Sequence, residues 1–493
     1  MVTADDGDEQ GSLTPRQRKR LTRVRSDNAM IATLAATGLI AAFMQTVVTP
    51  IIPELPTLLS TTRADASWVL TATLLAAAIS TPISGRLGDM YGKRRVMLAL
   101  LVIMAVGCII AALSYSLIPM VVGRVLQGVG LGVIALGISI LRDVVHPKNL
   151  GGAVALVSAT LGVGGALGLP LAATIAQYLD WHFLFWLATA LSGVAIIAVV
   201  AVIPVSTLRT GGHFDLIGAI GLAVGLVGIL LGVSKGNEWG WTSPLTLALL
   251  IGGVAVLIGW GFFELRSPNP LVDLRVAVRR TVLLTNLASI AVGFAFFVCT
   301  ASLPIVLESP TDSGVGLGLP LILASLCLMP LGLVMFFLSP VAARLSAARG
   351  PRTSLILGSI IITIGFTLAA FFLDEVWHVI LVSTITGIGV GFAYAAMPTL
   401  IMRAVPPGET AAANGLNSVM RTLGSTISAT VVGIILATHV VVTDDVGTPS
   451  REAFAYVFIM GAGVVLIGVV LALFIPRKFT DYDTSSIPVQ RTS

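Results

Sequence analysis

Long apolar segments alternate with short polar connections along most of the chain. A helix needs about 20 apolar residues to cross a hydrocarbon layer roughly 30 Å thick, and segments of this length recur throughout. Only helices and closed barrels satisfy their backbone polar groups inside lipid, and runs this long favour helices. The pattern predicts an all-α integral membrane protein with fourteen spans, at residues 29–53, 66–85, 95–115, 117–141, 150–177, 183–205, 215–234, 244–264, 281–307, 318–343, 353–373, 377–402, 410–438 and 454–476.

The composition agrees with a membrane protein and argues against several other functions. Hydrophobic residues make up 56% of the 493 residues and charged residues only 11%, too few to cover a soluble fold of this size. The three cysteines all fall inside apolar segments, which argues against a disulfide framework and a metal site. No Gly-x-x-x-x-Gly-Lys-Ser/Thr loop for ATP and no nucleophile–base cluster within the spans is present. We therefore expect no enzyme activity, no cofactor and no metal.

The distribution of basic residues sets the orientation. With the N-terminus in the cytoplasm, 24 of the 29 Lys and Arg residues fall on cytoplasmic segments, and the net charge of +5 reflects topology rather than affinity for nucleic acid. The external connections hold only Arg63, Lys235 and Arg451, and Arg124 and Arg421 lie within spans. This bias predicts that both termini are cytoplasmic.

A charged, glycine-spaced stretch separates the second and third predicted spans. It reads Gly85-Arg-Leu-Gly-Asp-Met-Tyr-Gly-Lys-Arg-Arg95, and we interpret it as a short cytoplasmic loop. Its glycines allow tight turns and close helix approach, and its single acid can contact several cations or the amide end of a helix. The residues to which we assign a transport or gating role here are Gly85, Arg86, Gly88, Asp89, Gly92, Lys93 and Arg94.

The stretch has a weaker copy 258 residues further on, which indicates two related halves. Arg86 aligns with Arg344 and Gly92 with Gly350, whereas the acid is replaced by Ala347. Paired halves of six helices are typical of secondary transporters. The predicted units are a basic tail, a first six-helix bundle, an inserted two-helix hairpin, a second six-helix bundle and a polar tail, at residues 1–28, 29–205, 206–280, 281–476 and 477–493.

The spacing Gly85, Asp89, Gly92, Lys93 and Arg94 closely resembles the loop signature of the major facilitator superfamily. The span count further resembles its fourteen-helix drug:proton antiporter branch. The resemblance implies the major facilitator fold and alternating access, in which two bundles rock about a central site.

Three spans carry residues that fit this resemblance. The fourth contains Gly123-Arg-Val-Leu-Gln-Gly, which is similar to a second family motif with a buried arginine, here Arg124, next to Gln127. An arginine within a span needs a polar cavity, a partner or a route to the interface, so snorkelling remains the alternative to a functional role.

The fifth span resembles the antiporter motif through Gly164, Gly168 and Pro170, although ordinary small-residue packing would give the same pattern. The span at 410–438 carries a polar stripe that we expect to line the cavity or to bond neighbouring helices, at Asn414, Asn417, Ser418, Arg421, Ser425 and Ser428.

The first span departs from the family pattern. Fourteen-helix drug exporters typically carry an aspartate where this chain has Met44, although Gln45, Thr46 and Thr49 keep the helix polar. No acid lies in the middle third of any predicted span, and Glu54 and Glu308 come closest, at matching external ends. A permanently charged cation at the midplane would require a carboxylate there, so we expect a neutral, amphiphilic or anionic cargo.

The sequence thus predicts a plasma-membrane transporter that exports small molecules, with protons as the coupling ion. One alternative is an exporter of an endogenous lipid or metabolite without strict proton coupling. A second is a sensor or structural partner that has lost transport, and a membrane enzyme is a weak third.

The charge bias generates a topology prediction. Reporter fusions after Arg95, Lys148, Arg280 and Arg403 should read cytoplasmic, and a fusion near Lys235 should read external. A cytoplasmic reading at Lys235 would remove the inserted hairpin and the fourteen-helix assignment.

Overall fold

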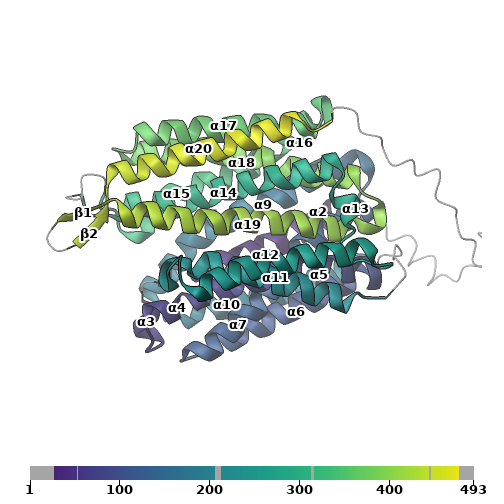
Figure 1. Ribbon diagram of the computed structural model, residues 1–493, viewed down its shortest axis with the longest axis horizontal. Coiled ribbons are helices and arrows are strands. Elements are labelled where there is room, and N and C mark those ends of the chain that lie inside the picture. Colours follow the sequence, from purple (N-terminus) through teal and green to yellow (C-terminus); the bar gives the residue numbers. More distant parts are fainter. Residues whose placement is uncertain (1–26, 53, 206–212, 312–315, 444–445, 477–493) are drawn as a thin grey trace, which may run out of the picture.

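The computed structural model describes residues 27–52, 54–205, 213–311, 316–443 and 446–476. Within these ranges, long helices run side by side in one elongated bundle (Figure 1). Thirteen of the described helices are long and apolar enough to cross a membrane, or fourteen if a helix pair bent by 42° counts as one span. This confirms the predicted all-α membrane fold. The two predicted tails lie outside the described residues, except for Asp27 and Asn28.

The first half of the chain forms one helical bundle with its own apolar core. That core is lined by buried residues such as Leu34, Met97, Leu136 and Phe185. The elements of this half are α2 (Asp27–Thr46), η1 (Thr49–Ile51), α3 (Leu55–Leu58), α4 (Arg63–Ala66), α5 (Trp68–Tyr91), α6 (Lys93–Ala112), α7 (Leu117–Gly130), α8 (Val133–Val144), α9 (Pro147–Tyr178) and α10 (His182–Val202).

The second half forms another bundle around a separate core, with Val292, Leu331, Phe366 and Phe458 among its buried members. A short antiparallel hairpin that the sequence analysis did not predict, β1 (Val440–Thr443) with β2 (Val446–Pro449), projects between the last two helices (Figure 1). The other elements of this half are α14 (Arg280–Glu308), α15 (Leu321–Phe337), α16 (Ser339–Arg349), α17 (Pro351–Phe371), α18 (Val376–Ala404), η3 (Pro407–Glu409), α19 (Thr410–Thr438) and α20 (Arg451–Leu473).

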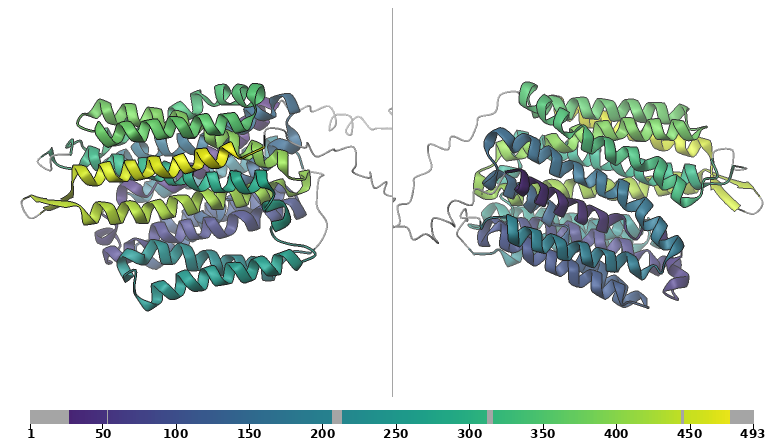
Figure 2. Two further views of the ribbon diagram at one scale, coloured as in Figure 1. Left: turned by 45° about the horizontal axis from the view of Figure 1, so that its top comes forward. Right: turned by 180° about the vertical axis from the view of Figure 1, so that it is seen from behind.

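Two further helices, α11 (Leu216–Trp239) and α12 (Pro244–Arg266), and the short α13 (Leu274–Ala277) connect the halves. Residues of α11 pack against both α5 and α19, in a small cluster that includes Ala78, Leu226 and Val419. Helix α12 is the outer helix of the two. Only 11% of its apolar stretch is buried inside the protein, compared with 44% for α11. Figure 2, left, shows this pair at the edge of the bundle.

The charged stretch after the second span is not the loop that we predicted. Helix α5 continues through Gly85, Arg86 and Asp89 to Tyr91, and the turn consists of Gly92, whose φ is +103°. The apolar pattern ends where the membrane ends, whereas backbone hydrogen bonds continue for more than another turn, so hydropathy placed the helix end too early. Gly350, which the repeat aligns with Gly92, likewise has a left-handed φ of +87° before α17.

Three other spans are interrupted, one of them the span predicted at 117–141, which consists of α7 and α8 with a break at Leu131 and Gly132. The segment predicted at 318–343 is the bent pair α15 and α16, which continues to Arg349. The segment predicted at 29–53 is α2 followed by η1, because Pro50 lacks the N–H that a continuous helix needs.

Glycines allow the two bundles to approach each other closely at two seams, α5 with α19 and α9 with α15. A Cβ at Gly332 of α15 would lie 2.0 Å from the carbonyl oxygen of Gly162 in α9, and one at Gly415 would lie 2.9 Å from that of Thr81. Such contacts replace hydrophobic attraction, which is absent between helices in lipid.

Candidate functional site

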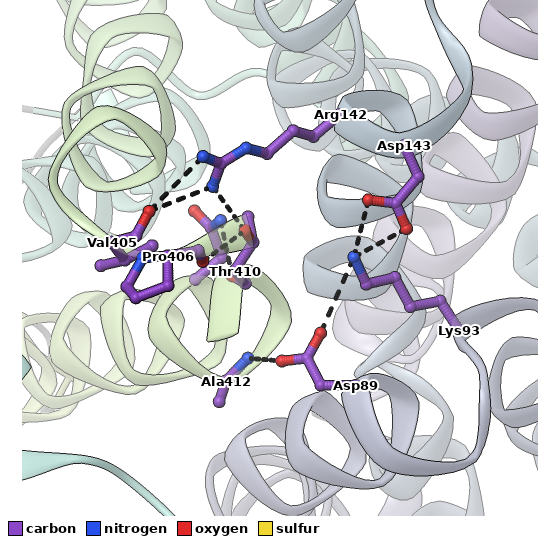
Figure 3. A network of polar contacts seen from close by, with 9 residues as sticks. Asp89, Lys93, Arg142, Asp143, Val405, Pro406, Thr410 and Ala412 are labelled. Atoms are coloured by element: carbon purple, nitrogen blue, oxygen red, sulfur yellow. Dashed lines mark hydrogen bonds and ion pairs between the residues drawn. The ribbon is translucent and has the colours of Figure 1, made fainter. Parts of the chain in front are cut away.

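Charged side chains from the first bundle meet the start of α19 at one end of the α5–α19 seam (Figure 3). Asp89 Oδ2 accepts a hydrogen bond from the backbone N–H of Ala412 at 3.1 Å. Lys93 Nζ lies 3.7 Å from Asp89 Oδ1 and 2.8 Å from Asp143 Oδ2. We call this cluster the latch: it consists of Asp89, Lys93, Arg142 and Asp143 with their contacts at Val405, Thr410 and Ala412. The end of the bundle where the latch lies is called the basic end.

The bond from Asp89 crosses between the two bundles and uses the amide end of a helix. Ala412 is the third residue of α19, so its N–H has no partner within the helix, and the helix dipole places partial positive charge there. Asp89 is only 2% exposed, so its carboxylate depends on Ala412 and Lys93 for compensation. A hydrogen bond to a charged group contributes about 1.5–3 kcal/mol to stability. Its loss would also leave a buried donor and a buried acceptor without a partner, which adds their desolvation penalty.

Arg142 makes a second connection across the same contact. Its Nη1 donates to the Thr410 hydroxyl at 2.6 Å, and both terminal nitrogens lie 3.4 Å from the Val405 carbonyl oxygen. Sequence reasoning missed Arg142 and Asp143 because they look like ordinary charges at the end of a span. The sequence does place Arg142 and Asp143 in the last turn of one helix and a Pro-Pro-Gly run just before the start of another at Thr410, so both sides of the contact lie at helix ends.

The structure divides the predicted gating residues between several roles. Gly85 is required at the seam, because a Cβ there would lie 2.6 Å from the Ala411 carbonyl oxygen. A Cβ at Gly88 would lie 2.3 Å from Leu136.

The arginines on either side have contacts outside the latch. Arg94 points away from the latch and donates to the Val200 carbonyl oxygen in α10 at 2.8 Å. Arg86 lines a small cavity beside α13 and η3, together with Asp273 and Glu409. The pKa of Glu409 is raised by burial and by the neighbouring Asp273.

Arg124 is fully buried and joins three helices of the first bundle. Its Nε donates to the Val69 carbonyl oxygen at 3.2 Å, and its Nη1 donates to the Met44 carbonyl oxygen at 3.1 Å and to Gln127 Oε1 at 2.5 Å. This geometry excludes the snorkelling alternative. Met44, which occupies the place of the family's acid, is itself buried and contributes its backbone rather than a titratable group.

The residues predicted on the first and fifth spans pack against each other. A Cβ at Gly164 would lie 2.3 Å from Ala42, and one at Gly168 would lie 2.4 Å from the Thr46 hydroxyl. Pro170 is buried within α9, while Gln45 and Thr49 are exposed. The glycines of α9 therefore act first as packing positions against α2.

The polar stripe of α19 faces α14 over part of its length. Asn417 Nδ2 donates to Asn286 Oδ1 at 3.0 Å and to the Ser289 hydroxyl at 2.6 Å. Arg421, near the middle of its span, lies over the ring of Tyr394, with 4.9 Å between its guanidinium carbon and the ring centroid. Asn414 bonds to the Thr410 carbonyl oxygen in its own helix.

Arg421 and Arg124 belong to different bundles and contact different partners, so they do not form one cluster. Glu54 and Glu308 are exposed, before α3 and at the end of α14.

Comparison with known proteins identifies the family to which this chain belongs. The Major Facilitator Superfamily model matches residues 34–429 and again 332–489. The lincomycin resistance protein LmrB of Bacillus subtilis is 25% identical over 92% of this chain and 96% of its own length. The putative multidrug resistance protein MdtD of Serratia proteamaculans is 26% identical over 84% of this chain and 87% of its own.

A solved structure shows the same fold. The human organic anion transporter MFSD10 (TETRAN) superposes with a TM-score of 0.63 at 15% identity, over 90% of this chain and 99% of that one. The family match covers most of the chain. The chain belongs to the major facilitator superfamily, and it is a multi-pass membrane transporter.

The seam geometry generates a prediction about Gly85. Gly85→Val should force α5 away from Ala411 and separate the bundles at the basic end. Spin labels at Arg95→Cys and Arg349→Cys, both exposed and in opposite halves, would report this as a longer distance in a background without native cysteines. Gly193→Val is the matched control, because an added Cβ there meets open space. Equal distance distributions in both variants would show that the seam does not hold this end closed.

Proposed function

We propose that this transporter exports amphiphilic small molecules from the cytoplasm by alternating access, and that the latch closes the cytoplasmic face. The observation that carries the proposal is the bond from Asp89 of one bundle to Ala412 of the other. The excess of Lys and Arg at the basic end supports its placement in the cytoplasm. Opening that face breaks the bonds of Asp89 and Arg142 to α19, so these bonds define one of the two states.

Export rather than import is supported by the relatives. LmrB is named a lincomycin resistance protein and MdtD a putative multidrug resistance protein, and a membrane transporter confers resistance when it carries the compound out of the cell. Both match the chain over more than four-fifths of its length, so the resemblance includes both bundles.

The charge of the cargo follows from the charges inside the spans. Among the described spans, every Asp and Glu lies near an end, whereas Arg421 lies near the middle. An organic cation bound there would have no carboxylate to compensate it and would be repelled by Arg421. The aromatic ring of Tyr394 and the guanidinium of Arg421 suit a neutral or anionic amphiphile instead.

Proton coupling requires a titratable group whose surroundings change between the two states. Glu54 and Glu308 are exposed at the other end of the bundle, whereas Asp89 is buried at an interface that must open. Lys93, Arg142 and Asp143 face it from the first bundle and the amide end of α19 from the second, and Arg86 lies on its own helix. We therefore assign the coupling proton to Asp89.

The assignment to Asp89 predicts a separation of two activities. In proteoliposomes, Asp89→Asn should still exchange cargo down the cargo's own gradient, but a pH gradient should no longer accelerate net transport. We expect net gradient-driven transport to fall at least about tenfold, because the asparagine side chain can still accept from the Ala412 N–H but cannot take up or release a proton. Glu54→Gln and Glu308→Gln serve as controls and should keep the response. An undiminished response in Asp89→Asn would contradict the assignment.

The cargo prediction is tested with three fluorescent probes of different charge. Cells making the protein should export a neutral dye such as Nile Red and an anionic fluorescein derivative at least about tenfold faster than ethidium, because an uncompensated buried charge costs well over 1.4 kcal/mol. Arg421→Gln should slow export of the anionic dye most. Robust ethidium export that disappears in Asp89→Asn would overturn the cargo assignment while leaving the export function intact.

A further inference from the structure

A second polar cavity lies at the basic end, on the side of the bundle opposite the inserted helices. It has a volume of about 560 Å³ and is lined by α2 and α9 of the first bundle and by α16 and α18 of the second. Figure 2, right, shows the side on which α2 and α9 lie. None of the latch residues lines this cavity, so it is separate from the site described above.

Three cationic side chains from both bundles surround the cavity. Lys148 lies in the first turn of α9, Arg344 is on α16 and Arg403 is in the last turn of α18. No Asp or Glu is among the described residues that line it. Asp27, which lies nearby, accepts from the His146 N–H and the Asn149 side chain instead. The cavity is therefore a concentrated positive site, which attracts an anion with more than one charged oxygen.

Two further features prepare the cavity for a hydrogen-bonding ligand. The Ser346 side chain lines it and is only 7% exposed, yet its hydroxyl oxygen has no hydrogen-bond partner in the described structure. Buried hydroxyl groups are normally bonded, so the Ser346 hydroxyl has unused hydrogen-bonding capacity beside the cavity. Gly151 and Gly152 of α9 leave open space where any other residue would place a side chain.

The interior of the cavity is apolar, unlike its mouth. Ala155, Leu156 and Ala395 lie about two helical turns from the cationic residues, since α9 and α18 rise about 1.5 Å per residue. A site with cations at the membrane surface and apolar walls toward the bilayer matches an amphiphile with an anionic head. A free inorganic anion would use the mouth and leave the apolar part empty.

We propose that this cavity binds the phosphate headgroup of an anionic membrane lipid. Lys148, Arg344 and Arg403 contact the phosphate oxygens, Ser346 donates a hydrogen bond, and an acyl chain follows the apolar wall beside Leu156. Because the ligands come from both bundles, a bound lipid connects them and favours the arrangement with the latch closed. This binding does not depend on which cargo the protein transports.

The test measures lipid binding to the purified full-length protein by native mass spectrometry. Phosphatidylglycerol should bind at least tenfold more tightly than phosphatidylcholine. Each cation near the site contributes about 1 kcal/mol, so Lys148→Gln, Arg344→Gln and Arg403→Gln should each weaken phosphatidylglycerol binding about fivefold, and the triple variant more than thirtyfold. Arg349→Gln is the matched control, an exposed arginine of the same helix as Arg344 that does not line the cavity.

A second variant tests the cavity without removing charge. Gly152→Phe places a ring in open space, so the protein should fold normally and lose phosphatidylglycerol binding. Monodispersity and thermal unfolding in phosphatidylcholine verify folding of every variant. Equal affinity in the triple variant and in Arg349→Gln would overturn the proposal. Displacement of the lipid by equimolar inorganic phosphate would instead assign the cavity to a soluble anion and reject the lipid.

Discussion

The structure depends on compensation of one buried carboxylate. Asp89 is removed from water where the two bundles meet, and a buried charge without partners costs several kcal/mol. Its partners come from both sides of the contact between the bundles, Lys93 from the first bundle and the N–H of Ala412 from the second. The opening that we propose would leave Lys93 with the first bundle and remove the amide end of α19 from Asp89. The contact seen in the structure therefore stabilises the Asp89 carboxylate electrostatically, and separation of the bundles would remove part of that stabilisation.

Close packing sets the distance over which that compensation works. An N–H···O bond of 3.1 Å requires the backbones of α5 and α19 to approach nearly to contact, and the absent Cβ of Gly85 permits this. Farther along the same seam Gly415 meets Thr81, and on the other side of the bundle Gly332 meets Gly162. Charge and packing thus act together, because a wider seam would leave Asp89 buried without its second partner.

Much of the fold could be predicted from the sequence, and the reasons for the misses are physical. Hydropathy located the spans because lipid demands continuous apolar helices, and the repeat located Gly92 and Gly350, which share a left-handed turn. Hydropathy could not locate helix ends, so the end of α5 was taken for a loop. Motif spacing indicated Asp89 but not Ala412, because the partner is a backbone group 323 residues away and has no sequence signature.

The inserted helices make the two sides of the transporter unequal. Helix α11 is bonded to both halves, through Lys235 Nζ to the Ala64 carbonyl oxygen at 3.1 Å and through the Thr430 hydroxyl to the Val233 carbonyl oxygen at 2.9 Å. Helix α11 covers the α5–α19 seam. In the described part of the chain, no inserted helix covers the α9–α15 seam, where four leucines are exposed: Leu167, Leu171, Leu323 and Leu326. The α9–α15 seam is itself closed, because Gly162 and Gly332 allow the two helices to lie in close contact. Lipid can therefore touch the junction of the two bundles directly only at this closed seam, because the inserted helices cover the other one.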